Sequence, residues 1–168
     1  MTSQRKTHNT SVWRLHAGMA AFWIAALALL YVGMDRYLQP PAMRVTSDGV
    51  LLLKRHLDGH FYADGQVNGQ SVRFLVDTGA TSVALTDELA SRAGLHGGKT
   101  AQFHTANGVR MGRIVRADFV KIGPLQVSNI SVSTGYTGKN VQDALLGQNF
   151  LRQFSVSING NELEMRRR

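Results

Sequence analysis

Residues 74–80 read Phe-Leu-Val-Asp-Thr-Gly-Ala and constrain the fold of this chain more than any other segment. Three consecutive apolar residues indicate a buried β-strand that leads the carboxylate of Asp77 into a turn. A carboxylate at the end of a buried strand is costly unless hydrogen bonds satisfy it, so its presence there needs a reason. The chain contains no internal repeat that could supply a second such aspartate. The segment therefore predicts half of an active site, which a second copy of the chain would complete.

The composition favours one small all-β domain. With 168 residues the chain can bury a hydrophobic core, and its 17 glycines and short apolar runs are typical of strands joined by tight turns. The absence of Cys excludes disulfides, cysteine nucleophiles and metal sites ligated by Cys. The net charge of +8 comes from scattered residues rather than from one basic face. We therefore expect no nucleic-acid partner, and a basic surface suited to anionic lipid.

An apolar run without any charged residue occupies residues 17–34. At 1.5 Å per residue it spans about 27 Å, close to the hydrocarbon thickness of a bilayer. Lys and Arg are more frequent before the run than after it, which predicts a cytoplasmic N-terminus. A cleaved signal peptide is the alternative, but the run is long for one and residues 31–35 lack a small-x-small cleavage pattern. A buried core helix is disfavoured because no amphipathic polar face is visible.

These observations divide the chain into four parts. We expect a cytoplasmic tail at residues 1–16, a transmembrane helix at 17–34, a linker at 35–47 and a globular domain at 48–168. The linker contains Pro40-Pro41 and little periodic pattern. Because the linker is expected to be exposed, cleavage that would release the domain is expected there.

Within the globular domain, Asn-Gly and Asp-Gly pairs separate short apolar segments and predict hairpins, because both central positions of a tight hairpin turn need positive φ. A strand at 82–85 should be followed by a short helix that Thr86 caps and Gly94 ends. Residues 143–151 are interpreted as a second short helix or a tight loop. The expected hairpins pair residues 61–67 with 71–76, 99–105 with 109–115, 116–122 with 125–133, and 154–158 with 162–165.

Two motifs in a fixed order carry a family resemblance. Asp77-Thr78-Gly79-Ala80 is followed 68 positions later by Leu145-Leu146-Gly147, with a glycine-tipped hairpin between them. In this arrangement the chain resembles the retropepsin-like aspartic proteases, and more closely their bacterial single-domain, membrane-anchored members. The resemblance runs from about residue 61 to residue 165. It implies an all-β, single-lobe acid-protease fold, closed like a β-barrel, with one or two short helices and preceded by one N-terminal transmembrane helix.

The resemblance also implies a role for each matched residue. Asp77 would be the catalytic aspartate, and Gly79 would let the backbone approach substrate because a Cβ there would intrude. The chain departs from the family after the second motif, with Gln148-Asn149 where Met-Ser is common. The remaining roles are catalytic-loop support by Thr78, Gly79 and Ala80, a flap over bound peptide with Thr105, Ala106, Asn107 and Gly108 at its tip, and packing behind the site by Leu145, Leu146 and Gly147.

The function implied is a membrane-anchored aspartic endopeptidase. Asp77 and its symmetry mate in a homodimer would activate a water for attack on a peptide bond. The domain would lie in the periplasm, held by a single-pass anchor in the bacterial inner membrane. The alternative is a catalytically weak or inactive dimeric peptide-binding module on the same fold. No cofactor or metal is expected, since no metal-ligand spacing links the histidines of the globular domain, which are His56, His60, His96 and His104.

Overall fold

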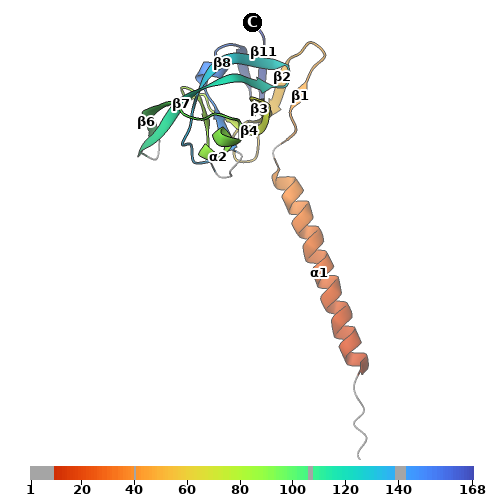
Figure 1. Ribbon diagram of the computed structural model, residues 1–168. Helices are drawn as coiled ribbons and strands as arrows, with labels where there is room; N and C mark the ends of the chain where they lie inside the picture. Colours follow the sequence, from red (N-terminus) through yellow and green to blue (C-terminus); the bar gives the residue numbers. More distant parts are fainter. Residues whose placement is uncertain (1–9, 40, 106–107, 139–142) are drawn as a thin grey trace, which may run out of the picture. The chain divides into compact units, whose positions relative to one another are not determined.

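The computed structural model describes residues 10–39, 41–105, 108–138 and 143–168, and it divides into two compact units, Met1–Gln39 and Pro40–Arg168. The first unit contains one long helix, α1 (Thr10–Leu38) (Figure 1). Within α1, residues His16–Leu38 are long and apolar enough to cross a membrane. The helix ends just before Pro40-Pro41, because a residue that precedes proline disfavours the α conformation.

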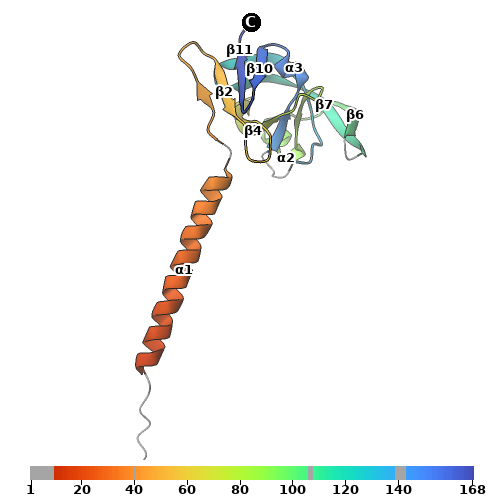
Figure 2. The ribbon, with the colours of Figure 1, turned by 180° about the vertical axis from the view of Figure 1, so that it is seen from behind.

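The second unit consists mainly of two β-sheets (Figures 1 and 2). The small sheet has the order β1 (Arg44–Val45), β2 (Leu51–Lys54), β11 (Glu162–Arg166) and β10 (Ser155–Asn159). The large sheet has the order β3 (Tyr62–Val67), β4 (Gln70–Val76), β9 (Asp143–Leu146), β5 (Val83–Leu85), β8 (Leu125–Ser133), β7 (Gly108–Ile122) and β6 (Lys99–Thr105).

The large sheet curls because β3 also pairs with β7, through Gln66 with Lys121 and Val67 with Val120. This pairing joins one end of the sheet to a strand near the other end. Two short helices complete the unit, α2 (Asp87–Arg92) and α3 (Gln148–Leu151). The predicted fold class, a mainly β single lobe with short helices after an apolar N-terminal helix, is confirmed.

Local turn and cap signals locate several elements. The β3–β4 hairpin turns at Asn68 and Gly69, whose φ angles are 49° and 85°. The side chain of Thr86 accepts a hydrogen bond from the Leu89 N–H and caps α2, as predicted. The two hairpins predicted around residues 109–115 and 116–122 share a single continuous strand, β7. Pairing of β7 with β8 extends from Ile114 to Ile122 across the predicted boundary, so no break separates the two segments.

The interpretation of residues 143–151 as one short helix or a tight loop was wrong in its first half. Ala144, Leu145 and Leu146 form the central strand β9, which is parallel to β4 on one side and antiparallel to β5 on the other. Ala144 and Leu146 are fully buried. A short apolar run that is paired on both edges has no alternation to distinguish it from a helix.

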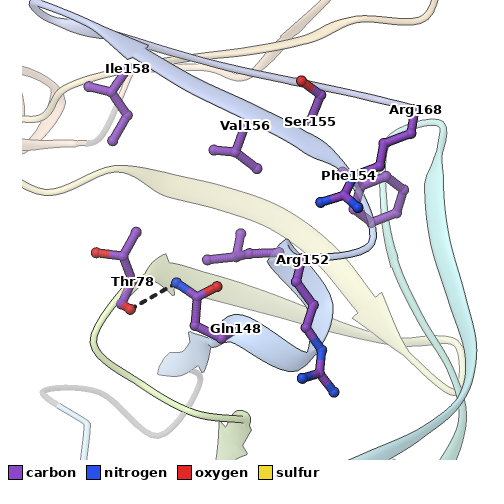
Figure 3. Close-up of a pocket in the computed structure, with 9 residues that line it drawn as sticks. Thr78, Gln148, Arg152, Phe154, Ser155, Val156, Ile158 and Arg168 are labelled. Atoms are coloured by element: carbon purple, nitrogen blue, oxygen red, sulfur yellow. Dashed lines mark hydrogen bonds between the residues drawn. The ribbon is translucent and has the colours of Figure 1, made fainter.

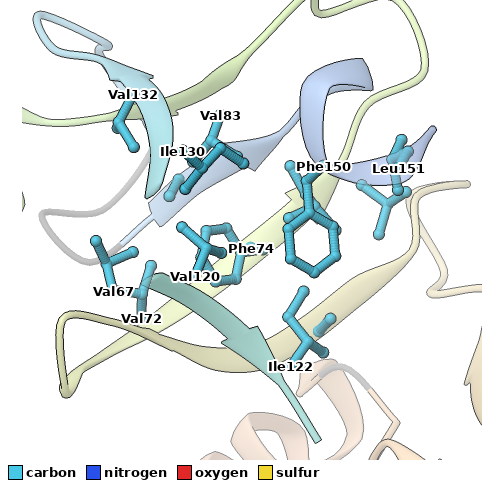
Figure 4. Close-up of a cluster of buried hydrophobic side chains, with 14 of the residues drawn as sticks. Val67, Val72, Phe74, Val83, Val120, Ile122, Ile130, Val132, Phe150 and Leu151 are labelled. Carbon is cyan, nitrogen blue, oxygen red and sulfur yellow. The ribbon is translucent and has the colours of Figure 1, made fainter. Parts of the chain in front are cut away.

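The core holds the strand that leads to Asp77. Val72, Phe74 and Val76 alternate along β4 and are all buried. Figure 4 shows Phe74 among side chains from β7, which include Val120, and near Phe150 of α3. Burying a Phe side chain contributes about 3 kcal/mol, so this packing fixes the position and direction of the strand end.

Candidate active site

Asp77 lies directly after β4, at the point where β4 and β9 end together. Its backbone N–H donates to the Leu146 carbonyl at 3.2 Å, and the preceding Val76 N–H donates to the Phe61 carbonyl at 2.9 Å. Asp77 is half-buried. Its Oδ1 accepts a hydrogen bond from the Gly79 N–H at 2.8 Å, and within the described ranges it forms no ion pair. One carboxylate oxygen is thus held by the turn, while the group remains accessible to solvent.

The turn that follows Asp77 depends on glycine for a reason that the sequence alone did not show. A Cβ at Gly79 would lie 3.2 Å from Asp77 Oδ1, closer than ordinary van der Waals contact. Thr78 and Gly79 are exposed and Ala80 is half-buried. The Ala80 N–H donates to the Asp77 carbonyl at 3.3 Å. The absence of a side chain at Gly79 therefore leaves room for the carboxylate.

Helix α3 is tied to this turn by three hydrogen bonds. The Gln148 N–H donates to the Ala80 carbonyl at 2.8 Å, and the Asn149 N–H donates to the Thr81 carbonyl at 3.1 Å. The Gln148 side chain also donates to the Thr78 carbonyl at 2.9 Å (Figure 3). Residues 148–149, where the chain departs from the common family pattern, therefore position the turn that carries Asp77 directly.

Asn149 connects two further strands to the site and was missed by reasoning from the sequence. Its Oδ1 accepts from the Val83 N–H at 2.9 Å, and its Nδ2 donates to the Ser131 carbonyl at 2.7 Å. Ser133 adds a second link between β5 and β8, because its hydroxyl donates to the Val83 carbonyl at 3.1 Å. The available signal was Asn149 itself, a polar residue directly before the apolar pair Phe150-Leu151.

Leu145, Leu146 and Gly147 lie at the end of β9 beside the Asp77 turn and are buried to different degrees. Leu146 is fully buried, whereas Leu145 is half-buried. Gly147 packs on the backbone of Ser82, so that a Cβ there would clash with the Ser82 carbonyl oxygen and lie 2.8 Å from the Ser82 nitrogen. Only glycine allows the end of β9 and the start of β5 to approach this closely.

An open hollow of about 660 Å³ begins beside Thr78 and continues over α3 to β10 (Figure 3). Thr78 and Gln148 lie on one side of it, and Val156 and Ile158 of β10 lie on the other. Within the described ranges, β10 pairs only with β11 and forms the edge of its sheet. The remaining residues that line the hollow are Leu151, Arg152, Phe154, Ser155 and Arg168, so none of the described residues that line it is acidic.

Strand β6 and residues 108–114 of β7 form a two-stranded extension, here named the arm, that projects from the rest of the second unit (Figures 1 and 2). Thr105 pairs with Gly108 at its outer end. Ala106 and Asn107, which were predicted at the tip of a flap, lie outside the described residues.

The turn before β3 is organised around Asp58. Its carboxylate accepts hydrogen bonds from the His60 N–H at 3.0 Å and the Tyr62 hydroxyl at 2.7 Å, and it lies 3.1 Å from His56 Nδ1. Burial raises the pKa of Asp58, but these hydrogen bonds and the neighbouring His56 together lower it from 3.8 to about 2. The turn leads directly to Phe61, whose carbonyl holds the strand residue before Asp77.

Asp58→Asn is expected to reduce stability at neutral pH, and this effect should shrink as the pH falls through about 2. The folded-state pKa lies below the unfolded value, so the contribution is present above about pH 4 and is lost as the pH falls to about 2. Solvent screening limits it to about 1 kcal/mol. Thermal melts of both proteins across this pH range provide the measurement, with Asp118→Asn, an exposed position on β7, as control. A stability difference that stays constant down to pH 2 would contradict the assignment.

Comparison with known proteins agrees with this geometry. Residues 63–153 match the family described as "gag-polyprotein putative aspartyl protease". The chain belongs to the retropepsin-like aspartyl proteases. The crystal structure of a retropepsin-like aspartic protease from Rickettsia conorii superposes with a TM-score of 0.57 and 30% sequence identity, and the match covers 74% of this chain and 91% of that one.

Two uncharacterized bacterial proteins are also similar to this retropepsin-like chain. One, from Sinorhizobium sp., is encoded in the cobV 5′ region and is 33% identical over 120 residues, which is 69% of this chain and 51% of that protein. The other, from Rickettsia prowazekii (strain Madrid E), is 36% identical over 112 residues, which is 65% of this chain and 47% of that protein. The chain therefore spans about half the length of the curated relatives that it matches.

Proposed function

We propose that the protein is a membrane-anchored aspartic endopeptidase that works as a homodimer. The observation that carries the proposal is the Asp77 carboxylate, which is held by the Gly79 N–H at the end of a buried strand and is accessible to solvent. The segments that surround it, residues 78–86 and 144–161, contain no other Asp or Glu. Membership of the retropepsin-like family supports the same reaction.

Two Asp77 carboxylates, one from each copy, would perform the chemistry. Like charges a few ångströms apart cannot both be ionised, so the pair retains one proton and titrates as a unit. The ionised member takes a proton from water, whose oxygen attacks the peptide carbonyl, while the protonated member donates its proton to the carbonyl oxygen. Transfer of a proton to the departing amine then breaks the C–N bond. Each copy supplies one carboxylate, so a monomer lacks one of the two roles.

The surface around Asp77 suits a second copy. A twofold axis between two Asp77 residues makes the exposed residues beside the turn, including Thr78, part of the interface. The hollow that begins at Thr78 is contiguous with the turn, and the outer edge of β10 offers backbone groups for pairing. A second copy would therefore complete the active site and cover the hollow in one step.

An equimolar mixture of the wild-type protein and Asp77→Asn tests whether the two copies share one active site. If both copies contribute an aspartate, random exchange of subunits lowers peptide cleavage to about one quarter of the unmixed wild type at the same total concentration. Independent active sites would instead give about one half. Incomplete exchange of subunits is controlled by giving one of the two proteins a mass label. Mass spectrometry of the isolated dimer then measures the fraction of heterodimers.

The arm is proposed to close over the bound peptide. Thr105, Ala106, Asn107 and Gly108 would form its tip, and an extended substrate would pair with its backbone as an added strand. Binding of a peptide to Asp77→Asn should then slow amide hydrogen exchange at Thr105 and Gly108. Unchanged exchange at both residues would argue against a flap.

The anchor is proposed to place the protease domain outside the cytoplasm. We propose a tail at 1–16, a transmembrane helix at 17–34, a linker at 35–47 and a domain at 48–168. Support for the anchor comes from residues His16–Leu38, which are long and apolar enough to span a bilayer. Helix α1 extends into the proposed linker as far as Leu38, and β1 (Arg44–Val45) occupies another part of it. The similar proteins are bacterial, so the membrane would be the inner membrane and the domain periplasmic. Protease added to intact spheroplasts should degrade the domain, and protection of the domain would mean the opposite orientation.

A further inference from the structure

The pairing register divides the side chains of the arm between two faces. Phe103 lies opposite Arg110, and Ala101 lies opposite Gly112, so these residues share one face. The opposite face carries the pairs Gln102 with Met111 and His104 with Val109. Successive residues of a strand point to opposite sides, and the two faces therefore differ in chemistry.

Contacts at the base of the arm show where each face is directed. A Cβ at Gly112 would clash with the Thr134 carbonyl oxygen, so the face that carries Gly112 packs on Thr134. Thr134 follows Ser133, whose hydroxyl is 3.3 Å from the Ser82 hydroxyl. Ser82 in turn packs against Gly147 beside the catalytic turn. This face, here named the inner face, is therefore on the side of the arm that adjoins the elements of the active site.

The other face adjoins different elements. Arg113, which alternates with Gly112, donates to Asp87 of α2 at 3.3 Å and to the Gly97 carbonyl at 3.0 Å. Val109 and Met111 on the same face are exposed. The face of Arg113 is thus occupied by α2 at its base and is open to solvent further out.

Arg110 is the charged group on the inner face nearest the outer end of the arm. Its side chain is exposed, and among the described residues it forms no ion pair. Residues 99–114 contain no Asp or Glu that could neutralise it. Arg113 and Arg116 differ from it, because Arg113 is paired with Asp87 and Arg116 donates to Asn129 at 3.0 Å.

We propose that Arg110 determines specificity by selecting peptides with an acidic side chain close to the scissile bond. The inference rests on the proposed peptidase function, since the arm would lie over the bound peptide. A guanidinium whose donors are not engaged by another described residue, as at Arg110, can bind a carboxylate through two parallel hydrogen bonds. Lys99 lies on the same face and the chain carries a net charge of +8, which favours approach of acidic peptides.

The test compares the wild type with Arg110 variants, each as the full chain in detergent micelles, in cleavage of a randomised synthetic peptide library. Wild type should cleave peptides with Asp or Glu near the scissile bond about tenfold more efficiently than their Asn or Gln counterparts. Arg110→Gln should reduce this ratio to about one, and Arg110→Glu should transfer the preference to Lys or Arg. Arg116→Gln removes the same charge from the same strand away from the arm, and it should leave the ratio unchanged.

Binding separates failure of this inference from failure of the peptidase function. Each acidic peptide and its Asn or Gln counterpart are made with a fluorescent label. Both are titrated against Asp77→Asn with and without Arg110→Gln, and fluorescence anisotropy gives the dissociation constants. A Glu preference in binding that Arg110→Gln removes supports the inference even where wild type cleaves nothing. Two results would overturn the inference. The first is a preference for acidic peptides that survives Arg110→Gln, and the second is cleavage or binding with no preference for acidic peptides. If the library is neither bound nor cleaved, both the inference and the peptidase function are wrong.

Discussion

Replacing Asp77 with Asn is expected to lower kcat/KM for peptide cleavage by at least about 10³-fold, because both copies lose the group that carries the proton. The fold should be retained, since the Asn Oδ1 can accept the hydrogen bond from the Gly79 N–H in the same way. Cleavage of the peptide library is measured at acidic and neutral pH for both proteins. Thermal melts verify that the variant remains folded.

Asp118→Asn provides the matched control. Asp118 is exposed on β7, and its replacement changes the charge by the same amount without touching the catalytic turn. Its activity should equal that of the wild type. Cleavage that persists in Asp77→Asn would show that another group catalyses the reaction. If the wild type and Asp77→Asn both bind peptides and neither cleaves them, the result favours the alternative of a dimeric peptide-binding module.

The parts of the site that could be predicted from the sequence depend on local signals. Residues 74–76 are apolar and lead to Asp77, and Asn68-Gly69 fixes the hairpin that delivers them. Thr86 caps α2 through a hydrogen bond only three residues along the chain. Turns and helix caps that form within a few residues can be predicted from the sequence, because few residue types form them.

The parts that could not be predicted depend on pairing between distant segments. Strand β9 inserts between β4 and β5, so Leu145 pairs with Leu75 and with Ala84. Asn149 links β5 to β8 through partners 66 and 18 residues away. An apolar run of three residues does not determine which strands flank it, and the sequence around a half-buried Asn does not determine its hydrogen-bond partners. The family resemblance supplied the association of the two motifs, but not these hydrogen bonds.

Gly147→Ala is expected to cost about 3 kcal/mol of stability and to lower the melting temperature of the second unit by roughly 10 °C. The φ of Gly147 is −93°, which alanine adopts without strain, so the cost is steric. The added Cβ would meet the backbone of Ser82, which cannot move aside as a flexible side chain could. Displacing Ser82 also shifts the neighbouring Ala80 and Thr81, which Gln148 and Asn149 hold in place.

Gly160→Ala separates this steric effect from the cost of replacing any glycine. Gly160 has a φ of +56° and no neighbouring atom within 4 Å of an added Cβ, so its replacement carries only the backbone strain of about 1 kcal/mol. Chemical denaturation of both variants gives the two free energies of unfolding. At temperatures where both remain folded, Gly147→Ala should also lose about 10²-fold in kcat, because small displacements of a catalytic group are costly, whereas Gly160→Ala should retain activity. Equal stability loss in the two variants, or full activity in Gly147→Ala, would mean that the close approach of β9 and β5 does not position Asp77.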